Sequence, residues 1–235
     1  MRDYQIKIEP FEYISLQEFT INRTMNEHVI ASLAMRIKDE WKEEYMGILS
    51  EETWVRIIGI DKEDAGEINM VIFNGIVTGY SFRQDGYETL MNLNVTSGTI
   101  LLDLKPHFRV FQREETLCTD IHRKVVATYT EGRVLSMEGE QDKTEGVLVQ
   151  FQETDWEFLK RLTGRTGLYL VPEVLEKGVR YTIGLPEGSK RTIETDRIQT
   201  NFDFSEYRER FFPDMICSPF LLLSEVYLKT VMMYQ

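Results

Sequence analysis

Apolar and polar residues alternate along much of the N-terminal part of the chain. The clearest alternation runs from Val29 to Ile37, with His28, Ser32 and Arg36 on the face opposite the apolar one. The predicted buried face consists of Val29, Ala31, Leu33, Met35 and Ile37. A period of two is typical of a strand with one face on a core and one on solvent. We therefore predict a half-buried strand in this segment.

Further strands are predicted at Trp54–Ile60 and in the apolar-rich run from Met70 to Phe82. Asn74-Gly75 and Gly79 interrupt the second run. Glycine inside a strand pattern indicates a bulge, a bend or a close approach of another backbone. The run is thus expected to contain a bulge, a sharp bend or a hairpin rather than one straight strand.

Asp85-Gly86 lies between two further strand-like segments, Tyr80–Arg83 and Tyr87–Val95. Both turn residues tolerate a positive φ, so this dipeptide predicts a hairpin. Several strands joined by short turns, with no helical crossover between them, favour a small antiparallel barrel or sandwich.

Helical periodicity first appears after Thr116, which is placed to cap a helix. Its expected apolar face, at spacings of four, is Leu117, Ile121, Val125 and Tyr129. The polar stretch Glu131–Glu145 contains two glycines and is predicted to be a loop or an irregular connection.

The segment Val149–Gly167 predicts a strand that leads into a capped helix. Thr154 and Glu157 match the capping-box pattern, in which each side chain binds the backbone N–H of the other residue. Gly164 or Gly167 is expected to end the helix in the left-handed conformation. The expected apolar face of this helix is Phe158, Leu159 and Leu162.

Strand patterns return at Leu168–Val171 and Val179–Ile183, and the tail Phe220–Tyr234 is also strand-like. The chain is therefore predicted to be mainly β with α (α+β), with two antiparallel β-barrel-like domains linked by a helical middle region. The expected divisions are a first β-barrel at residues 1–112, a helical or irregular connection at 113–167, and a second β-barrel-like domain at 168–235 that is incomplete at its C-terminus.

Composition and charge narrow the range of possible functions. A net charge of −12 argues against a nucleic-acid binder, which needs a basic surface to displace counterions. Cys118 and Cys217 lie far apart without a paired spacing, which favours free thiols in a reduced, cytosolic setting. No secretory signal and no membrane span is predicted. The expectation is a soluble acidic protein.

No convergent chemistry is found in the pattern of reactive residues. His28, His107 and His122 lack the local partners of a metal site, and His122 is assigned to the exposed side of its helix. The acidic segment Asp61–Glu67 lacks oxygen ligands that a calcium loop needs, and Gly184–Arg191 lacks the spacing of a phosphate loop. No metal, cofactor or phosphate site is expected.

Asp155 and Glu157 are assigned as helix-start charges rather than as catalytic acids, because a spacing of two points them to different sides of a helix. Cys118 is assigned to the core rather than to a nucleophile. No catalytic site is expected, and the protein is predicted not to be an enzyme.

Aromatic residues allow two interpretations in two places. Trp156, Phe158 and Tyr169 would either line a ligand groove or, as we favour, pack the helix onto a barrel. The aromatic residues within Phe202–Phe212 would form core or a subunit contact.

Three segments together resemble the N-terminal part of phage late control protein D and the valine-glycine repeat spike proteins of type VI secretion. They are Phe73–Tyr80 (FNGIVTGY), Leu101–Gln112 (LLDLKPHFRVFQ) and Phe151–Gly167 (FQETDWEFLKRLTGRTG). The residues singled out as family signature are Gly75, Phe151, Asp155, Phe158, Leu159, Arg161, Leu162 and Gly167.

The resemblance implies two β-barrels with helices between them, in a subunit that assembles as a homotrimer. Two barrels per chain would give a pseudo-sixfold ring. Such a ring would adapt a sixfold tail tube to a threefold spike in a contractile phage tail, a tailocin or a type VI-like injection system. The implied partners are the tube protein, the spike protein and other baseplate proteins, with assembly in the bacterial cytoplasm. This role requires symmetry and surface complementarity rather than a reaction.

Two other functions stay open. One is a tail-associated module of a non-contractile phage, and the other, of a different class, is a cell-wall hydrolase or glycan-binding module. The family continues into an oligosaccharide-binding-type barrel and a spike, whereas this sequence stops at Gln235. Either the sequence is a fragment, or the spike is carried by a separate chain.

Overall fold

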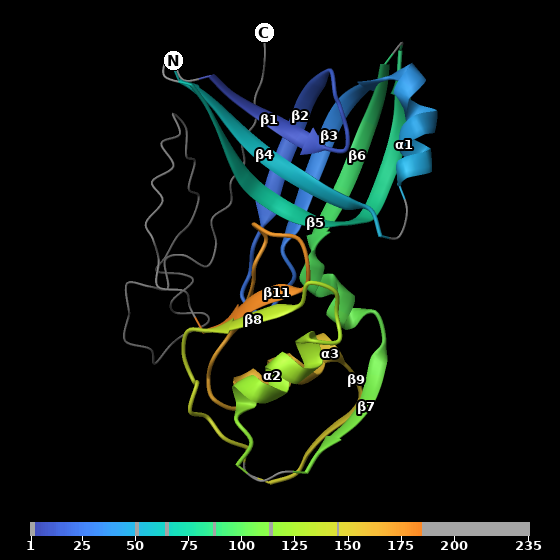
Figure 1. Cartoon of the computed structure of the whole chain (residues 1–235). Helices are drawn as coiled ribbons and strands as arrows, with labels where there is room; N and C mark the ends of the chain where they lie inside the picture. Colours follow the sequence, from blue (N-terminus) through green and yellow to red (C-terminus); the bar gives the residue numbers. More distant parts are fainter. Residues whose placement is uncertain are drawn as a thin grey trace, which may run out of the picture.

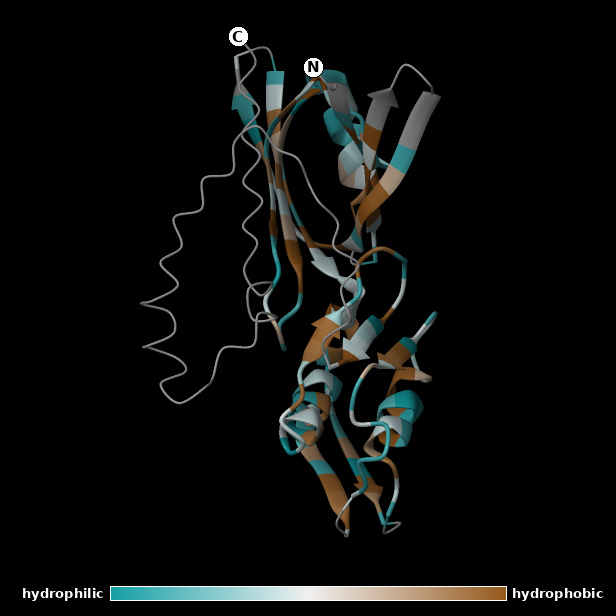
Figure 2. Ribbon diagram, turned by 90° about the vertical axis from the view of Figure 1, so that its left-hand side faces the viewer, coloured by the Kyte–Doolittle hydropathy of each residue, from teal (hydrophilic) through white to brown (hydrophobic). Residues whose placement is uncertain are grey.

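Two stacked lobes make up the part of the chain that the structure, a computed structural model, describes (Figure 1). The described residues are 3–49, 52–63, 66–86, 88–112, 115–144 and 146–184. The upper lobe is a curled antiparallel sheet, and the lower lobe combines short strands with two helices. Hydrophobic segments, brown in Figure 2, occur in both lobes and alternate with polar ones. Each lobe has its own cluster of buried apolar side chains.

Six strands form the sheet of the upper lobe, in the order β1-β4-β5-β6-β3-β2. Every neighbouring pair is antiparallel, and the two outer strands, β1 and β2, do not pair with each other. The sheet is therefore a half-barrel, and within the described residues β1 and β2 each have one edge that pairs with no other strand. The strands span Asp3–Glu9 (β1), Ser15–Asn22 (β2), Ile30–Lys38 (β3), Trp54–Glu63 (β4), Gly66–Asp85 (β5) and Glu88–Ser97 (β6).

Strand β3 confirms the alternation predicted around Val29–Ile37. All five apolar positions of that pattern are buried, whereas Ser32 and Arg36 on the other face are partly exposed. A short helix that the sequence pattern did not predict, α1 (Lys42–Ile48), follows the 3₁₀ turn η1 (Asp39–Trp41). It packs onto the same core through Tyr45, whose hydroxyl donates to the carbonyl oxygen of Glu12 at 3.0 Å.

The run Met70–Phe82 lies inside one continuous strand, β5, which is bulged rather than folded into a hairpin. The pairing register shifts once against β4 and once against β6, at Val77/Gly79. A Cβ at Gly75 would collide with the carbonyl oxygen of Thr96 on β6, so only glycine fits there. The predicted hairpin at Asp85-Gly86 is confirmed, with Gly86 at φ 67°.

The lower lobe contains a two-stranded ribbon, a three-stranded sheet and two α-helices. The ribbon pairs β7 with β9 in antiparallel fashion, and the small sheet has the order β10-β11-β8. Its elements are η2 (Gly98–Asp103), β7 (Pro106–Phe111), α2 (Cys118–Val126), β8 (Arg133–Ser136), β9 (Leu148–Thr154), α3 (Asp155–Gly164), β10 (Leu170–Pro172) and β11 (Arg180–Ile183).

Two predictions for this lobe were wrong in detail. Helix α2 begins at Cys118, and its N-cap is Leu117, without a side-chain cap, so Thr116 does not cap it. The stretch Glu131–Glu145 was expected to be irregular, but it contains β8, which pairs in parallel with β11. A strand this short has too few residues to show a period of two, so the pattern could not indicate it.

The predicted second barrel falls mostly outside the described residues. Its described part contributes β10 and β11, which join the middle region through β8. The aromatic segment Phe202–Phe212, the tail Phe220–Tyr234 and Cys217 lie beyond the described part, as does most of Gly184–Arg191. The proposed domain boundaries therefore stay a prediction.

Hydrogen bonds join the two lobes at several points. The carbonyl oxygen of Asn26 accepts a hydrogen bond from the indole N–H of Trp156 at 3.2 Å. The side-chain oxygen of Asn26 accepts one from the backbone N–H of Leu170 at 2.8 Å. The side-chain amide of Asn74 donates to the carbonyl oxygen of Leu175 at 2.8 Å. The segment around β10 thus returns to the base of the upper sheet and fixes the lower lobe against it.

Candidate functional site

The capped helix α3 and the ribbon before it form the candidate site. Thr154 is the N-cap, and its hydroxyl oxygen accepts the N–H of Glu157 at 3.1 Å. The carboxylate of Glu157 in turn accepts the N–H of Thr154 at 2.9 Å. The predicted capping box is confirmed. The Thr154 hydroxyl also donates to the carboxylate of Asp103, which ties the start of α3 to η2.

Helix α3 ends at Gly164, and its C-cap, Arg165, has a helical φ of −66°. Of the two glycines expected to end it, Gly167 is the one with a positive φ, 71°. The backbone N–H of Leu168 then donates to the carbonyl oxygen of Thr163 at 3.3 Å, and the chain turns toward β10.

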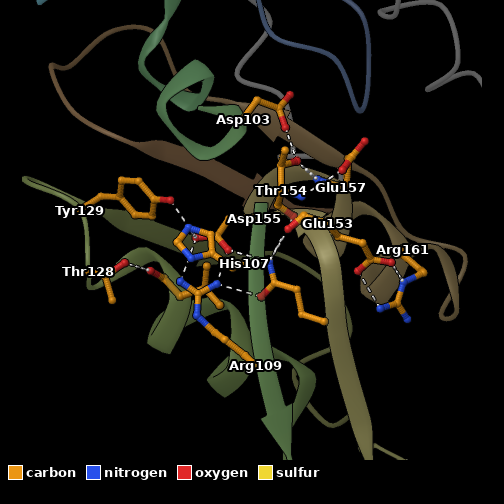
Figure 3. A network of polar contacts seen from close by, with 12 residues as sticks. Asp103, His107, Arg109, Thr128, Tyr129, Glu153, Thr154, Asp155, Glu157 and Arg161 are labelled. Atoms are coloured by element: carbon orange, nitrogen blue, oxygen red, sulfur yellow. Dashed lines mark hydrogen bonds and ion pairs between the residues drawn. The ribbon is translucent and has the colours of Figure 1, made fainter. Parts of the chain in front are cut away.

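Asp155 is the centre of a buried polar network (Figure 3). Its carboxylate accepts two hydrogen bonds from the guanidinium of Arg109, one of them at 3.2 Å. Gln150 donates to it at 2.8 Å and the hydroxyl of Tyr129 at 2.7 Å. The Nε2 atom of His107 lies 3.7 Å away. These partners come from β7, β9 and the chain that follows α2, so one carboxylate joins three parts of the lobe.

The assignment of Asp155 as a helix-start charge was incomplete. It lies in the first turn of α3, where an anion is favoured by the helix dipole, but its side chain is 0% exposed. Burial acts to raise its pKa, and the hydrogen bonds from Arg109, Gln150 and Tyr129 outweigh burial and hold the pKa below its ordinary value. The carboxylate is thus kept ionised inside the lobe.

The other residues singled out as family signature take different positions. Phe158, Leu159 and Leu162 are buried in the lower core. The guanidinium of Arg161 binds both carboxylate oxygens of Glu153 at 2.8 Å and the carbonyl oxygen of Val149 at 2.8 Å. Phe151, by contrast, is 62% exposed. The signature therefore marks a folded unit together with one outward aromatic side chain.

Histidine placement was partly wrong. His122 was expected on the exposed side of its helix, but it is buried and lies between the hydroxyls of Tyr181, at 2.8 Å, and Thr163, at 3.1 Å. Burial lowers its pKa to about 3. Burial also lowers the pKa of His28, although Asp103, 2.9 Å from its Nε2 atom, opposes this shift.

Aromatic residues of α3 pack rather than line a groove. Trp156 and Phe158 are buried, and the Phe158 ring stacks on Phe111 of the ribbon with 5.6 Å between centroids. Cys118 is partly buried against the lower core, where burial raises the pKa of its thiol. Among the described residues no group of three or more His, Cys, Asp or Glu is placed to hold a metal ion.

This arrangement holds parts of the lobe together and leaves no group free to react. We call its four residues, Arg109, Tyr129, Gln150 and Asp155, the latch. Each proton donor that contacts Asp155 is used to hold strands, helix and connection together, and the carboxylate is occupied by three partners. The burial of this network is the functional feature that sequence reasoning missed. The available signal of a buried charge was the basic residue Arg109, which stands among the apolar residues of Phe108–Phe111.

A family model described as the phage tail baseplate hub (GPD) matches residues 62–196, which is more than half of the chain. The match includes the two central strands of the upper sheet, β5 and β6, and all four residues of the latch. This chain belongs to the phage tail baseplate hub family. The matched residues of the hub chain therefore form a structural domain of the phage tail baseplate hub type.

Solved structures share the fold of this hub chain. The E. coli c3393 protein, described as a type VI secretion component similar to the T4 tail proteins gp27 and gp5, has a TM-score of 0.55 at 13% identity over 76% of this chain and 48% of that one. The 43 kDa tail protein of prophage MuSo2 from Shewanella oneidensis has a TM-score of 0.57 at 14% identity over 78% and 53%. A tail protein from Neisseria meningitidis MC58 has a TM-score of 0.56 at 11% identity, over 82% of this chain and 54% of that one.

The hub chain spans about half the length of these structures. No curated protein matches its sequence. Within the described residues no helix is both long and apolar enough to cross a membrane.

Proposed function

We propose that the chain is a subunit of a trimeric ring that adapts a sixfold tail tube to a threefold spike. The observation that carries the proposal is the match of the baseplate hub family to residues 62–196. Those residues include the two central strands of the curled sheet, β5 and β6, and the described part of the lower lobe. Its partners would be a tube protein, a spike protein and other baseplate proteins, and it would assemble in the bacterial cytoplasm.

The open half-barrel supports this role. In the described part of the chain the outer strands β1 and β2 each leave one edge unpaired, and a sheet with unpaired edges is prone to pair with other chains. In a ring, neighbouring subunits would cover such edges. The chain would act without catalysis, because the buried ionised network around Asp155 is engaged in holding the fold together.

The residues of the family signature would serve this framework. Gly75 would let β5 and β6 approach, Asp155 would lock the lobe, and Gly167 would turn the chain toward β10. Phe158, Leu159 and Leu162 would supply the core of the lobe. Arg161 would fix the ribbon to α3, and Phe151 would contact a partner.

Co-expression with a tube protein and a trimeric spike protein tests the proposal. The expected result is a complex that contains three copies of this chain, measured by light scattering, with a threefold ring seen by electron microscopy. Failure of the chain to join tube or spike would contradict it. Reproducible lysis of purified cell wall by the chain alone would instead favour the hydrolase alternative.

A further inference from the structure

The ribbon formed by β7 and β9 has an apolar outer face. Phe108 and Phe151 pair directly across the two strands, as do Val110 and Val149. Their side chains are 66%, 62%, 42% and 40% exposed, respectively. The two phenylalanine rings contact edge to face, with 5.8 Å between centroids. These four residues are called the ribbon face below.

The opposite face of the ribbon packs inside the lower lobe. Phe111, Leu148 and Gln150 point inward, where Phe111 and Leu148 join the lower core and Gln150 binds Asp155. Because side chains alternate along a strand, the residues between them must face outward. The ribbon thus has one face on the core and one apolar face without a partner in the described part of the chain.

A bulge in the backbone of β9 helps to turn the ribbon face outward. Glu153 pairs with His107 and Phe151 with Phe108, so Gln152 is an extra residue between them, a bulge with φ 51°. Such a φ is uncommon for a residue other than glycine and is held only where the surroundings enforce it. The bulge lets Phe151 face outward while Thr154 still reaches the start of α3. Arg161 fixes the same region from outside, through Glu153 and Val149.

The size of the ribbon face fits the centre of a protein–protein contact. Its four side chains expose on the order of 400 Å², given the ~200 Å² of a whole aromatic side chain. A standard interface takes about 800 Å² from each partner, with an apolar centre and a polar rim. The ribbon face would therefore supply about half of one footprint, in paired aromatic residues of the kind that dominate binding energy.

The low charge of the ribbon face suits a second copy of this acidic chain as the occupant. Two chains of net charge −12 repel each other, so they can approach only where carboxylates are absent or neutralised. The ribbon face contains no charged residue. At its edge Glu153 is neutralised by Arg161, and the exposed Lys105 lies just before β7. An apolar centre whose edge carries no net negative charge is therefore a place where two acidic copies of this chain can meet with little repulsion.

We propose that the ribbon face, Phe108, Val110, Val149 and Phe151, is a contact surface for a neighbouring copy of this chain in the ring. This inference rests on the proposed ring function and assigns a surface to it. In a closed ring each copy offers the ribbon face to a different surface of the next copy, because cyclic contacts are head to tail.

The test uses the full chain with Phe108→Thr and Phe151→Thr combined. Threonine keeps the preference for strand, so the ribbon is expected to fold and its circular dichroism to stay unchanged. Met46→Ser with Tyr80→Ser, which removes comparably exposed apolar side chains from the upper lobe, is the matched control. Sedimentation velocity over a concentration series is expected to show a dissociation constant raised about 100-fold in the ribbon variant and unchanged in the control.

Amide hydrogen exchange on the unmodified chain gives a second measurement that does not depend on a variant. Protection of β7 and β9 is expected to rise with protein concentration. Protection that is independent of concentration, or a chain that stays monomeric at every concentration, would overturn the inference. So would an unchanged dissociation constant in the ribbon variant.

Failure of this inference can be told apart from failure of the proposed function. If the ribbon variant joins tube and spike as a ring just as the unmodified chain does, the contact lies elsewhere and the hub role stands. If the unmodified chain itself joins neither, the hub role fails.

Discussion

The carboxylate of Asp155 points into the lower lobe from the first turn of α3, where it meets Arg109, Gln150 and Tyr129. A buried ion pair is weak evidence of net stability, but removing one partner leaves a buried charge without compensation. The position of this side chain therefore determines more than the local start of a helix. It decides whether the ribbon, the helix and the chain after α2 stay together.

Asp155→Asn is expected to lower the free energy of unfolding by about 3 kcal/mol, since Arg109 loses its ionic partner and the two donors that face the new NH₂ group lose their acceptor. Urea denaturation followed by fluorescence measures this. The control is Asp120→Asn, which breaks an exposed pair with Arg123 and is expected to cost about 0.5 kcal/mol or less. Equal losses in the two variants would contradict the role given to Asp155.

Acid is expected to destabilise the protein through His122. Its pKa is about 3 in the folded chain and 6.5 as the ordinary value, so the unfolded state binds the proton more readily. The stabilisation is complete above pH 6.5 and is lost as the pH falls toward 3, at up to ~1.4 kcal/mol per pH unit.

Urea denaturation at a series of pH values between 8 and about 4 measures the effect of His122. His122→Gln, which keeps a polar group between Tyr181 and Thr163, is expected to flatten the slope. A slope that persists unchanged in this variant would assign the pH dependence to other groups. The lowered pKa values of His28 and Asp155 act in the same direction, and Asp155 does so at the acid end of the series.

At the scale of elements, α3 and the ribbon form one unit whose parts are joined end to end. The bulge at Gln152, the capping box at Thr154 and the pair between Arg161 and Glu153 follow within one short stretch. Each fixes the direction in which the chain leaves β9. The helix therefore begins where the ribbon ends, without a loop between them.

Thr154→Ala is expected to destabilise the protein by about 1–2 kcal/mol, because the cap of α3 is lost. The bond from the same hydroxyl to Asp103 is lost with it. Thr154→Ser keeps the hydroxyl and is expected to restore most of the difference. Thermal unfolding monitored by circular dichroism measures both variants, and a serine variant as unstable as the alanine one would contradict the capping role.

At the scale of the whole molecule, the two lobes are expected to unfold together. Asn26 joins them through Trp156 and Leu170, and Asn74 holds the segment after β10. Differential scanning calorimetry is expected to show the two lobes unfolding in one transition, with equal calorimetric and van't Hoff enthalpies.

Asn26→Ala tests this coupling. Asn26 has φ 62°, a conformation that asparagine tolerates better than alanine, and the variant also loses the acceptor for the N–H of Leu170. The expected loss is about 2 kcal/mol, with the transition broadened or split. Two separate transitions already present in the unmodified chain would show that the lobes fold independently.

Features that depend on neighbours along the chain could be predicted from sequence. The alternation at Val29–Ile37, the hairpin at Asp85-Gly86 and the capping box at Thr154 each rest on interactions within a few residues. The apolar side of α3 follows from helical spacing in the same way. The mainly β character with a helical middle region, and the resemblance to a tail hub family, were available from the sequence alone.

Only the tertiary structure decided which polar groups are buried. Arg109 and Asp155 are 46 positions apart in the sequence, and His122 and Tyr181 are 59 apart, so no local pattern brings them together. The parallel pairing of β8 with β11 is decided in the same way. Burial is a property of the packed chain, and charge or spacing along the sequence does not specify which side chains packing encloses. The capped helix was therefore visible in the sequence, while the latch beneath it and the apolar face beside it were not.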